Sequence, residues 1–379
     1  METTEGFAGL RCLSCETTTD ASAERCPDCD GLLDPVYDEA TLERAHERVH
    51  NGERAAVLPF DDPVTIGEGG VTLIESPDLA TELGVGRVLV ADEGHNPTGA
   101  LVDREMAVAV TAAHEAGAET VALPTTGNGG QAAAAYAARA GLEAECFVPS
   151  RSVFANKAMI NVHGGEMSVV GGRYSDAAEV FEEASAEEEW RSLAPFGTPY
   201  RHEGAKTLAY DLLAELDDAP DAVVHPTSHG TGLYGLAKGF REFTETDHLG
   251  DVPRLYAAQP EGCAPLVDAG DEPTSVEHPD TICGALEVPA PAGGALALDA
   301  LAETDGTAVA AEDDDILEGA ASLAAAGVPL SATGGAAAAG ARNLADDAFD
   351  TDETVVLVNP ATANREADIL RSHLMKQGI

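Results

Sequence analysis

Residues 120–148 decide the fold class, and they read TVALPTTGNGGQAAAAYAARAGLEAECFV. The runs Thr120–Leu123 and Ala144–Val148 are short and apolar, which is typical of buried strands. Between them, Gly130–Ala140 is rich in alanine, the residue with the highest helix propensity. A strand, a helix and a second strand in this order predict two parallel strands joined by a helical crossover. The stretch therefore indicates an α/β protein.

The same alternation extends outward in both directions. Further strands are predicted at Arg87–Val90, Ala222–His225, Arg254–Ala258 and Thr354–Val358, and further helical stretches at Glu39–Val49, Ala205–Leu216 and Ile316–Ala325. Such alternation predicts a parallel sheet with helices on both faces. Right-handed crossovers then place ligand-binding loops at the carboxyl ends of the strands. The Pro- and Gly-rich stretch 289–294 is predicted to be a surface loop.

The charge balance restricts the partners of this chain. Its 379 residues suggest two domains and a small appendage, and 67 acidic against 21 basic residues give a net charge of −46. Such a surface repels nucleic acid and anionic membranes, so we expect neither as a partner. The acidic residues are spread along the whole chain, which favours adaptation to high salt, where screening relieves the self-repulsion. An ordinary acidic cytosolic protein is the alternative.

The chain shows no targeting or membrane-spanning pattern. Its first residues, Met1–Glu5, are acidic, and no apolar run approaches the ~18 residues of a membrane span. We therefore expect a cytoplasmic location, whose reducing conditions argue against disulfides among the seven cysteines. Three of them, Cys146, Cys263 and Cys283, are isolated in the sequence and are expected to be buried apolar side chains.

The other four cysteines form one motif. Cys12, Cys15, Cys26 and Cys29 have the spacing C-x2-C-x10-C-x2-C, which can deliver four thiolates to a tetrahedral Zn²⁺. With all four positions taken by protein, the predicted zinc is structural and folds an otherwise coreless segment. Four reduced thiols in a loop, or a redox pair, are the alternatives. A redox pair is disfavoured because the motif is duplicated and opens no helix after a strand.

Five further motifs occur in an order found in one known family. They are Gly67–Ile74, Asp92–Gly99, Thr125–Asn128, Arg201–Thr207 and Ser228–Gly232. They are similar to the G-E-G-G-T-P-L, D-E-G-x-N-P-T-G, S-S-G-N, R-x-E-G-x-K-T and Gly-rich phosphate-binding segments of threonine synthases. The chain therefore resembles the threonine synthase family, which has the fold-type-II pyridoxal-phosphate scaffold. The resemblance covers residues 10–360, and a zinc ribbon also occurs in many members.

The resemblance implies an architecture. It implies two open-sheet α/β domains of the tryptophan synthase beta-like type, facing a cleft, together with the N-terminal zinc ribbon. The ribbon is expected at residues 10–35. The larger domain is expected at residues 60–100 and 205–379, and the smaller at residues 101–204. A homodimer is the oligomeric state that the resemblance favours.

The resemblance also implies ligand-binding residues. Thr125, Thr126, Gly127 and Asn128 match the turn that holds the substrate carboxylate, and Asn128 also matches a cofactor contact. Gly230, Thr231 and Gly232 match the loop that cradles the cofactor phosphate. Each segment is a turn from a strand into a helix, and free backbone N–H groups at a helix start suit an anion. His229 lies in the Gly-rich segment as a further anion contact, or as an ordinary, partly exposed loop side chain; His95 lies in the Asp92–Gly99 segment, where the family tolerates several residues, and is expected to be an ordinary loop side chain.

One substitution separates this chain from the family chemistry. Members continue after D-E-G-x-N-P-T-G with S-F-K-D-R-G, whose lysine forms a Schiff base with pyridoxal phosphate, whereas residues 100–105 here read A-L-V-D-R-E. Val102 stands at the lysine position and has no nitrogen, so we predict no catalytic residue and no internal aldimine. Departures from the family pattern also occur at Ala100, Glu105, 331–334 and 359–364. Changes at several points around one ligand indicate that its chemistry was abandoned.

The chain's four lysines offer another anchor for the cofactor. Lys206 and Lys238 match family lysines other than the Schiff-base residue, and Lys157 and Lys376 lie on polar helical stretches. We interpret each as a solvated surface charge, because activation of a lysine needs a desolvated site.

Three hypotheses for the function follow. The first is a pseudoenzyme or a protein independent of pyridoxal phosphate, which binds a small anionic, amino-acid-like metabolite in the inherited cleft. The second is a working pyridoxal-phosphate lyase that converts O-phosphohomoserine to threonine. The third is a noncatalytic subunit that pairs with an active paralogue. A fold alone cannot choose among them.

Overall fold

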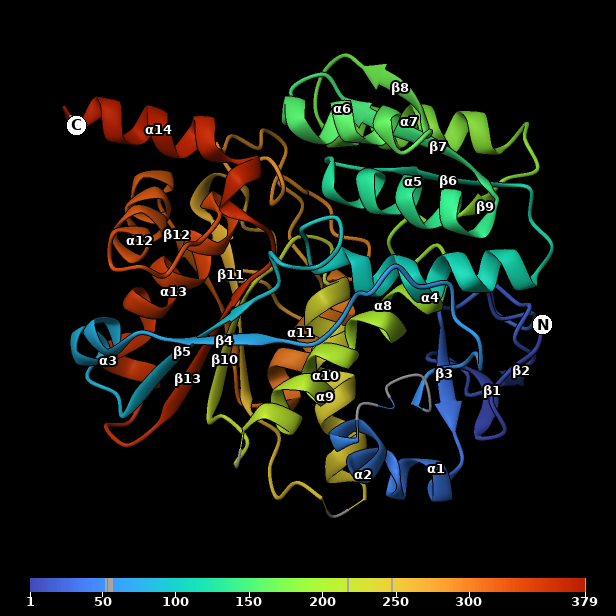
Figure 1. Cartoon of the computed structure of the whole chain (residues 1–379), viewed down its shortest axis with the longest axis horizontal. Helices are drawn as coiled ribbons and strands as arrows, with labels where there is room; N and C mark the ends of the chain where they lie inside the picture. The colour runs from blue at the N-terminus through green and yellow to red at the C-terminus, as the bar shows by residue number, and fades with distance from the viewer. Residues whose placement is uncertain (52, 54–56, 217, 247, 379) are drawn as a thin grey trace. The chain divides into compact units, whose positions relative to one another are not determined.

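Strands and helices alternate in the computed structural model as the sequence predicts (Figure 1). The structure describes residues 1–51, 53, 57–216, 218–246 and 248–378. Its contacts divide the chain into two units. Unit 1 comprises Met1–Gly69, Val102–Glu215 and Gly235–Val252, and unit 2 comprises Gly70–Leu101, Leu216–Tyr234 and Pro253–Ile379. The predicted ribbon lies in unit 1, and the predicted larger domain is divided between the units, so the predicted domain boundaries stay predictions.

Unit 2 is built on a six-stranded sheet of order β12-β11-β10-β13-β5-β4. Its strands are β4 (Thr72–Glu75), β5 (Arg87–Asp92), β10 (Ala222–Pro226), β11 (Arg254–Pro260), β12 (Thr307–Ala311) and β13 (Thr354–Asn359). All neighbours are parallel except β4, which lies antiparallel to β5 at the edge. The four strands predicted in this part of the chain are confirmed. Their buried, β-branched sequences are those of a sheet covered on both faces.

The helices of unit 2 pack on this sheet or on one another. They are α3 (Pro77–Leu83), α11 (Gly294–Glu303), α12 (Asp313–Ala325), α13 (Ala332–Ala348), α14 (Ala367–Lys376) and the first turn of α10 (Thr231–Thr244), with short 3₁₀ turns at Glu261–Cys263 and Ala363–Arg365. Helix α13 packs directly on the sheet, and its many alanines and glycines permit the close approach. A Cβ at Gly340 would lie 3.0 Å from Val309 and 3.1 Å from Ala258. The unit has its own hydrophobic core between these elements.

Unit 1 contains a second, smaller sheet of order β8-β7-β6-β9, in which all pairs are parallel. Its strands are β6 (Thr120–Pro124), β7 (Glu143–Pro149), β8 (Glu166–Val170) and β9 (Arg191–Ser192). The helices around it are α4 (Val102–Glu115), α5 (Asn128–Ala140), α6 (Phe154–Val162) and α7 (Tyr174–Ser185). Helix α5 contacts β7, α4 and α6, while α7 contacts β6, β7 and β8. The strand–helix–strand unit predicted from residues 120–148 is confirmed.

The N-terminal segment of unit 1 is a small antiparallel sheet of order β2-β1-β3. It consists of β1 (Phe7–Cys12), β2 (Thr18–Thr19) and β3 (Leu33–Tyr37), and is followed by α1 (Glu39–Glu43) and α2 (Ala45–His50). Strand β3 contacts α8 (Tyr200–Ala205), which is followed by α9 (Thr207–Glu215). The single helix predicted over Ala205–Leu216 is thus two helices that meet at Lys206.

Two predictions about burial have different outcomes. Cys146, Cys263 and Cys283 are fully buried, as predicted. Residues 289–293 form a loop that leads into α11, with Ala290 and Ala292 exposed but Pro289, Pro291 and the two glycines buried, so the predicted surface loop is confirmed only in part. The prolines pack against the start of α11, where a Cβ at Gly294 would lie 2.8 Å from Pro291. Among the described residues, no helix is long and apolar enough to cross a membrane.

Candidate ligand and metal sites

Position 102 is the first residue of α4, and its side chain is apolar. Val102 is half-buried and packs against the hydrophobic core of unit 1. The three residues before it are fixed within unit 2 by backbone contacts. Leu101 donates to the carbonyl of Pro360 at 2.9 Å, Ala100 forms a bridge with Ala361, and Thr362 donates to the carbonyl of Gly99 at 2.9 Å. Residues 99–101 therefore hold position 102 in place, and the side chain at that position carries no amine.

The segments that depart from the family pattern bind to one another within unit 2. Asn359 is buried, and its Oδ1 accepts from the backbone and hydroxyl of Ser331 at 3.1 and 3.0 Å. Its Nδ2 donates to Asp92 at 2.8 Å. Thr333 donates through its backbone and hydroxyl to the buried Glu366, whose pKa is raised by burial. These polar groups therefore satisfy one another within unit 2.

Glu105, another departure, is also integrated into the fold. Its Oε2 accepts from Nε and Nη2 of Arg201 at 2.8 and 2.6 Å, and both side chains are buried. Nearby, Arg104 contacts Asp211 at 2.6 Å and Thr207 at 3.0 Å. A buried carboxylate is tolerated only with such a partner. The glutamate at position 105 is thus stabilised by a buried ion pair with Arg201.

The turn at Thr125–Asn128 connects β6 to α5. The Thr125 hydroxyl oxygen accepts hydrogen bonds from the backbone N–H groups of Gly127 and Gly130, both at 3.0 Å. Asn128 Oδ1 accepts from Asn156 Nδ2 at 2.9 Å, which ties the turn to α6. Gly127 has φ +135°, a conformation open to glycine. One backbone donor of the turn and one of the first turn of α5 are therefore used within this segment.

The Gly-rich loop at 228–232 connects β10 to α10. Gly230 has φ +89°, and a Cβ there would lie 2.7 Å from the carbonyl oxygen of Gly293, so only glycine fits. The loop is held by a hydrogen bond from Gly293 N to the His229 carbonyl at 2.9 Å. Thr231, the first residue of α10, is 4% exposed, and its hydroxyl has no hydrogen-bond partner among the described residues. A helix start with an unpartnered hydroxyl is suited to an anion.

His225 is a residue of this loop region that the sequence did not single out. It lies near the end of β10, is 4% exposed, and burial lowers its pKa to about 4. Nδ1 lies 3.2 Å from the Thr227 hydroxyl oxygen, while Nε2 has no hydrogen-bond partner among the described residues. A histidine directly before a Gly-rich strand-to-helix turn was the available signal. His229 is half-buried and His95 is exposed, both in loops.

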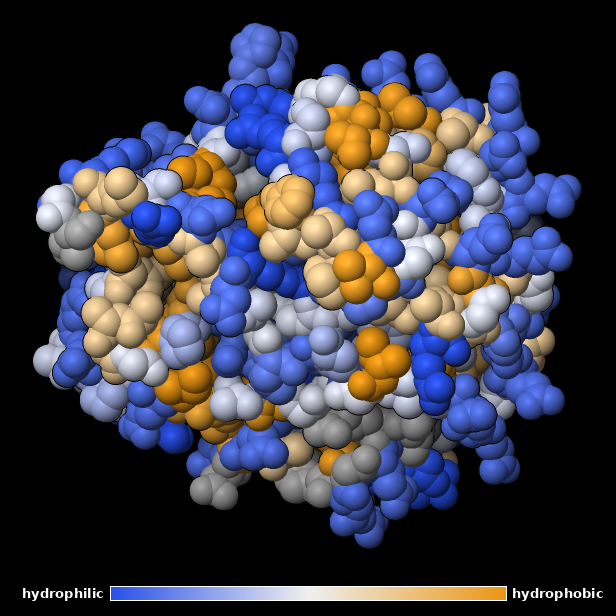
Figure 2. Space-filling view, turned by 45° about the horizontal axis from the view of Figure 1, so that its top comes forward, coloured by the Kyte–Doolittle hydropathy of each residue, from blue (hydrophilic) through white to orange (hydrophobic). Residues whose placement is uncertain are grey.

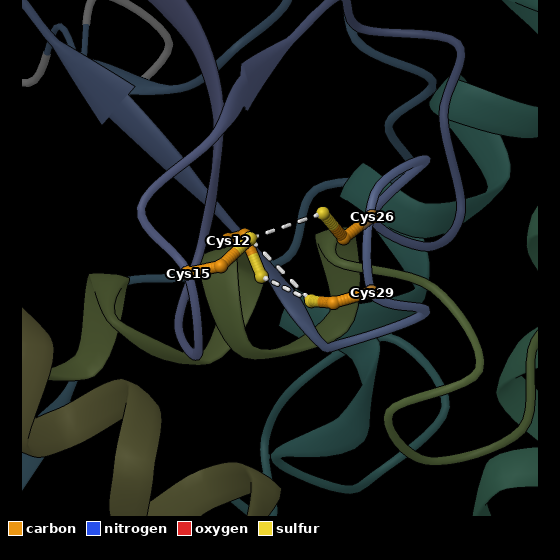
Figure 3. Close-up of side chains that lie close together, drawn as sticks. All are labelled: Cys12, Cys15, Cys26 and Cys29. Atoms are coloured by element: carbon orange, nitrogen blue, oxygen red, sulfur yellow. Dashed lines mark hydrogen bonds between the residues drawn. The ribbon is translucent and has the colours of Figure 1, made fainter.

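The four predicted zinc ligands lie together in the N-terminal segment. Their sulfur atoms are all within 4.8 Å of one another, and Figure 3 shows the four side chains converging from two turns. The sulfur of Cys12 lies 3.5 Å from that of Cys29, and the sulfur of Cys15 lies 3.5 Å from that of Cys26. Four thiolates at about 2.3 Å from a tetrahedral Zn²⁺ would be about 3.8 Å apart. The cluster therefore fits a zinc ion with small adjustments.

A buried network of charges joins the cysteine-bearing segment to the rest of unit 1. Lys206 is 0% exposed and Lys238 is 5% exposed, so the interpretation of these two lysines as solvated surface charges is wrong. Lys206 contacts Glu203 and Glu242, and Lys238 lies 2.7 Å from both Asp34 and Glu203. The hydroxyls of Tyr37 and Tyr210 and the ring of His202 complete the network.

The charges in this network are matched. Burial raises the pKa of Asp34, but Lys238 and His202 outweigh it and hold that pKa well below its usual value. Burial likewise opposes ionisation of Glu203, yet Lys206 and Lys238 lower its pKa. For Glu242 burial prevails, and its pKa is raised. Both lysines are therefore held in contacts with buried carboxylates.

Comparisons with known proteins agree with this geometry. The family model described as pyridoxal-phosphate dependent enzyme matches residues 64–361. The chain is similar to threonine synthase of Methanosarcina acetivorans, with 34% identity covering 92% of this chain and 90% of that protein. It is also similar to threonine synthase of Methanocaldococcus jannaschii, with 31% identity covering 94% of this chain and 93% of that protein.

Solved structures extend the likeness to the fold. The processed form of threonine deaminase isoform 2 from Solanum lycopersicum has a TM-score of 0.71 at 18% identity, covering 90% of this chain and 89% of that one. Diaminopropionate ammonia lyase from Escherichia coli also has a TM-score of 0.71 at 18% identity, covering 89% and 92%. The α/β fold is thus that of fold-type-II pyridoxal-phosphate enzymes.

Proposed function

Because this chain belongs to the pyridoxal-phosphate-dependent enzyme family, as a member of its threonine synthase branch, we propose that it is a pseudoenzyme. The observation that carries the proposal is Val102, an apolar residue packed on the core at the position where the family needs a lysine. Without an amine there, the chain lacks the group that anchors the cofactor and then moves protons. We therefore propose that the protein binds a ligand without converting it.

The remaining lysines support this proposal. Lys206 and Lys238 are bound to carboxylates in the interior of unit 1, and withdrawing either would leave those carboxylates uncompensated. Lys157 donates to the carbonyl of Ser150, and Lys376 is exposed near the end of α14. Neither Val102 nor the four lysines therefore fit the role of covalent anchor for pyridoxal phosphate.

The ligand that we propose is a small anionic, amino-acid-like metabolite. Its anionic group would bind at the Gly-rich loop, through the backbone donors of Gly230, Thr231 and Gly232 and the Thr231 hydroxyl. Within unit 1, we propose the turn of Thr125, Thr126, Gly127 and Asn128 as an anion-binding turn as well, and its internal hydrogen bonds fix its conformation. Pyridoxal phosphate itself is expected at most as a noncovalent ligand.

Binding and turnover assays test this function together. O-phosphoserine should bind to the purified protein, and O-phosphohomoserine should give no threonine when pyridoxal phosphate is supplied. Threonine formation would restore the lyase hypothesis. A second, lysine-bearing chain that co-purifies would identify a noncatalytic subunit of a heteromer, in place of the homodimer that we propose.

We also propose that Cys12, Cys15, Cys26 and Cys29 hold one structural zinc. The convergence of four sulfurs within 4.8 Å supports it, since an uncoordinated cluster of thiols gains little from such proximity. The zinc would connect the two turns of the segment that contributes Asp34 and Tyr37 to the buried network.

A surface adapted to high salt is a further part of the proposal. On the face drawn in Figure 2, hydrophilic residues project along the outline and hydrophobic residues form separate small groups. A net charge of −46 repels itself at low ionic strength, where the screening length is longest. Thermal melts should therefore show a melting temperature that rises from low to molar potassium chloride. A flat or falling melting temperature would count against the adaptation.

A further inference from the structure

The cysteine cluster and Asp34 lie on one pair of strands. Cys12, the last residue of β1, pairs with Leu33, the first residue of β3, and Asp34 follows directly. The turn that leads into β3 is packed against the sulfurs, because a Cβ at Gly31 would lie 3.0 Å from Cys12 Sγ and 3.1 Å from Cys29 Sγ. The position of Asp34 is therefore tied to the arrangement of the sulfur atoms.

Strand β3 carries two side chains into the buried network of charges. Asp34 accepts from Nζ of Lys238 at 2.7 Å, and the Tyr37 hydroxyl donates to Glu203 at 2.6 Å. The ring of Tyr37 also lies against Lys206, whose Nζ is 4.2 Å from the ring centroid. Both lysines are buried, and a buried ammonium group is tolerated only with a partner. Displacement of β3 would thus leave charges in the interior of unit 1 with less compensation.

Helix α8 carries these contacts on to the start of α4. His202 of α8 lies 2.9 Å from Asp34 through its Nε2. The residue before it, Arg201, forms a buried ion pair of 2.6 Å with Glu105 in the first turn of α4. The two helices are in backbone contact at Gly204, where a Cβ would clash with α4. A chain of direct contacts therefore runs from the sulfur atoms through β3 and α8 to the helix that begins at position 102.

We propose that metal occupancy of the cysteine cluster regulates the order of this part of unit 1. With Zn²⁺ bound, the N-terminal segment holds Asp34 and Tyr37 in the network. Without it, β3 loses its anchor, the network is left incomplete, and α8 and the first turn of α4 become more mobile. The proposal rests on the proposed zinc site and adds a regulatory role to it.

Coupling of this kind is reciprocal. If bound zinc holds Asp34 against Lys238, the contact with Lys238 must in turn strengthen zinc binding. The first experiment therefore measures the zinc affinity of the full-length protein by competition with a chromogenic chelator. We expect Lys238→Met to bind zinc about tenfold more weakly than wild-type protein, as is usual for coupled sites. Asp211→Asn is the matched control. It breaks the buried pair of Arg104 and Asp211, which does not involve β3, and should leave the zinc affinity unchanged.

Hydrogen exchange of wild-type protein gives a second readout, which covers the case in which Lys238→Met does not fold. Removal of zinc with a chelator should accelerate amide exchange in α8 and in the first turn of α4. Helices α6 and α7 of the same unit lie outside the chain of contacts described above, so their exchange should stay as it was. Return of zinc should restore the protection of α8.

The outcomes separate this inference from the zinc site on which it rests. If wild-type protein contains no zinc and binds none when it is added, the site itself fails and the inference fails with it. If zinc binds, but folded Lys238→Met binds it as tightly as wild-type protein does, the cysteine-bearing segment is independent of the network and the proposal is wrong. Exchange of α8 that is indifferent to zinc would contradict it equally.

Discussion

The Thr125–Asn128 turn and the Gly-rich loop are built alike, but they differ in whether their buried threonine hydroxyl has a hydrogen-bond partner. Each connects a parallel strand to a helix, and each contains a buried threonine. In the first, the Thr125 hydroxyl oxygen accepts from two backbone N–H groups of its own turn. In the second, the Thr231 hydroxyl and His225 Nε2 have no partner among the described residues. The threonine hydroxyl is thus engaged within the first turn, whereas in the second it has no hydrogen-bond partner among the described residues.

The same contrast extends to the larger clusters of unit 1. The buried network around Lys206 and Lys238 pairs cations with carboxylates, so it needs nothing from outside. The four cysteines place their sulfur atoms within 4.8 Å of one another, an arrangement that we propose serves a zinc ion. We expect substitutions among internally paired groups to lower the free energy of unfolding. Substitutions at the proposed metal or ligand sites should instead weaken binding of the metal or ligand.

Metal removal should have the largest effect. A Cys26→Ser/Cys29→Ser variant loses half of the ligand set, and structural zinc contributes about 10–16 kcal/mol to the folding of small zinc segments. We expect wild-type protein to contain one zinc and the variant none, with hydrogen exchange of β1–β3 accelerated in the variant. If metal analysis finds no zinc in wild-type protein, or if the variant retains zinc fully, the cluster is not a metal site. Cys146→Ser, at an isolated buried cysteine, is the control for general effects of removing a thiol.

Breaking the self-sufficient network should have the next largest effect. Lys206→Met removes one cation and leaves Glu203 and Glu242 with less compensation, at a cost of about 3–5 kcal/mol in the free energy of unfolding. Denaturant unfolding measures the loss. Lys157→Met, at a lysine on the surface of α6, should change stability by less than about 0.5 kcal/mol. Equal effects of the two substitutions would contradict the account of the network.

The two threonines give the smallest and most direct test of the contrast. Thr125→Val leaves the N–H groups of Gly127 and Gly130 without their acceptor and should destabilise the protein by about 1–3 kcal/mol without any ligand. Thr231→Val removes a hydroxyl that has no partner, so unfolding should change little, by less than about 1 kcal/mol. Its effect should be on phosphate affinity instead. Similar unfolding costs at both positions would remove the distinction between the turns.

The strand–helix alternation was predictable from sequence because its signal is local. Buried parallel strands are short, β-branched runs, and the crossover helices are rich in alanine, so Thr120–Leu123 and Gly130–Ala140 identified their elements directly. The strands β1–β3 carry no such periodicity, and their order is set by turns around the cysteines. Only the cysteine spacing, a pattern of side-chain chemistry, indicated that segment in advance.

The buried polar groups were not predictable because their partners are distant in the sequence. Lys238 is paired with Asp34, and nothing near either residue indicates the other. A lysine on a helix is solvated in most proteins, so the local pattern favoured the wrong environment. His225 was missed for a similar reason. Its position shortly before the Gly-rich segment was visible in the sequence, but its burial and the Thr227 hydroxyl beside its Nδ1 were not.

Reductive trapping at position 102 tests the central claim most directly. Protein incubated with pyridoxal phosphate would be reduced with borohydride, digested and mapped for pyridoxyl-lysine, with Val102→Lys treated in parallel. Since Val102 has no amine and Lys206 and Lys238 are held by carboxylates, we predict no site-specific adduct in wild-type protein. In Val102→Lys we predict an adduct on the peptide that contains position 102. An adduct at Lys157 or Lys206 of wild-type protein, together with threonine formation, would contradict the pseudoenzyme.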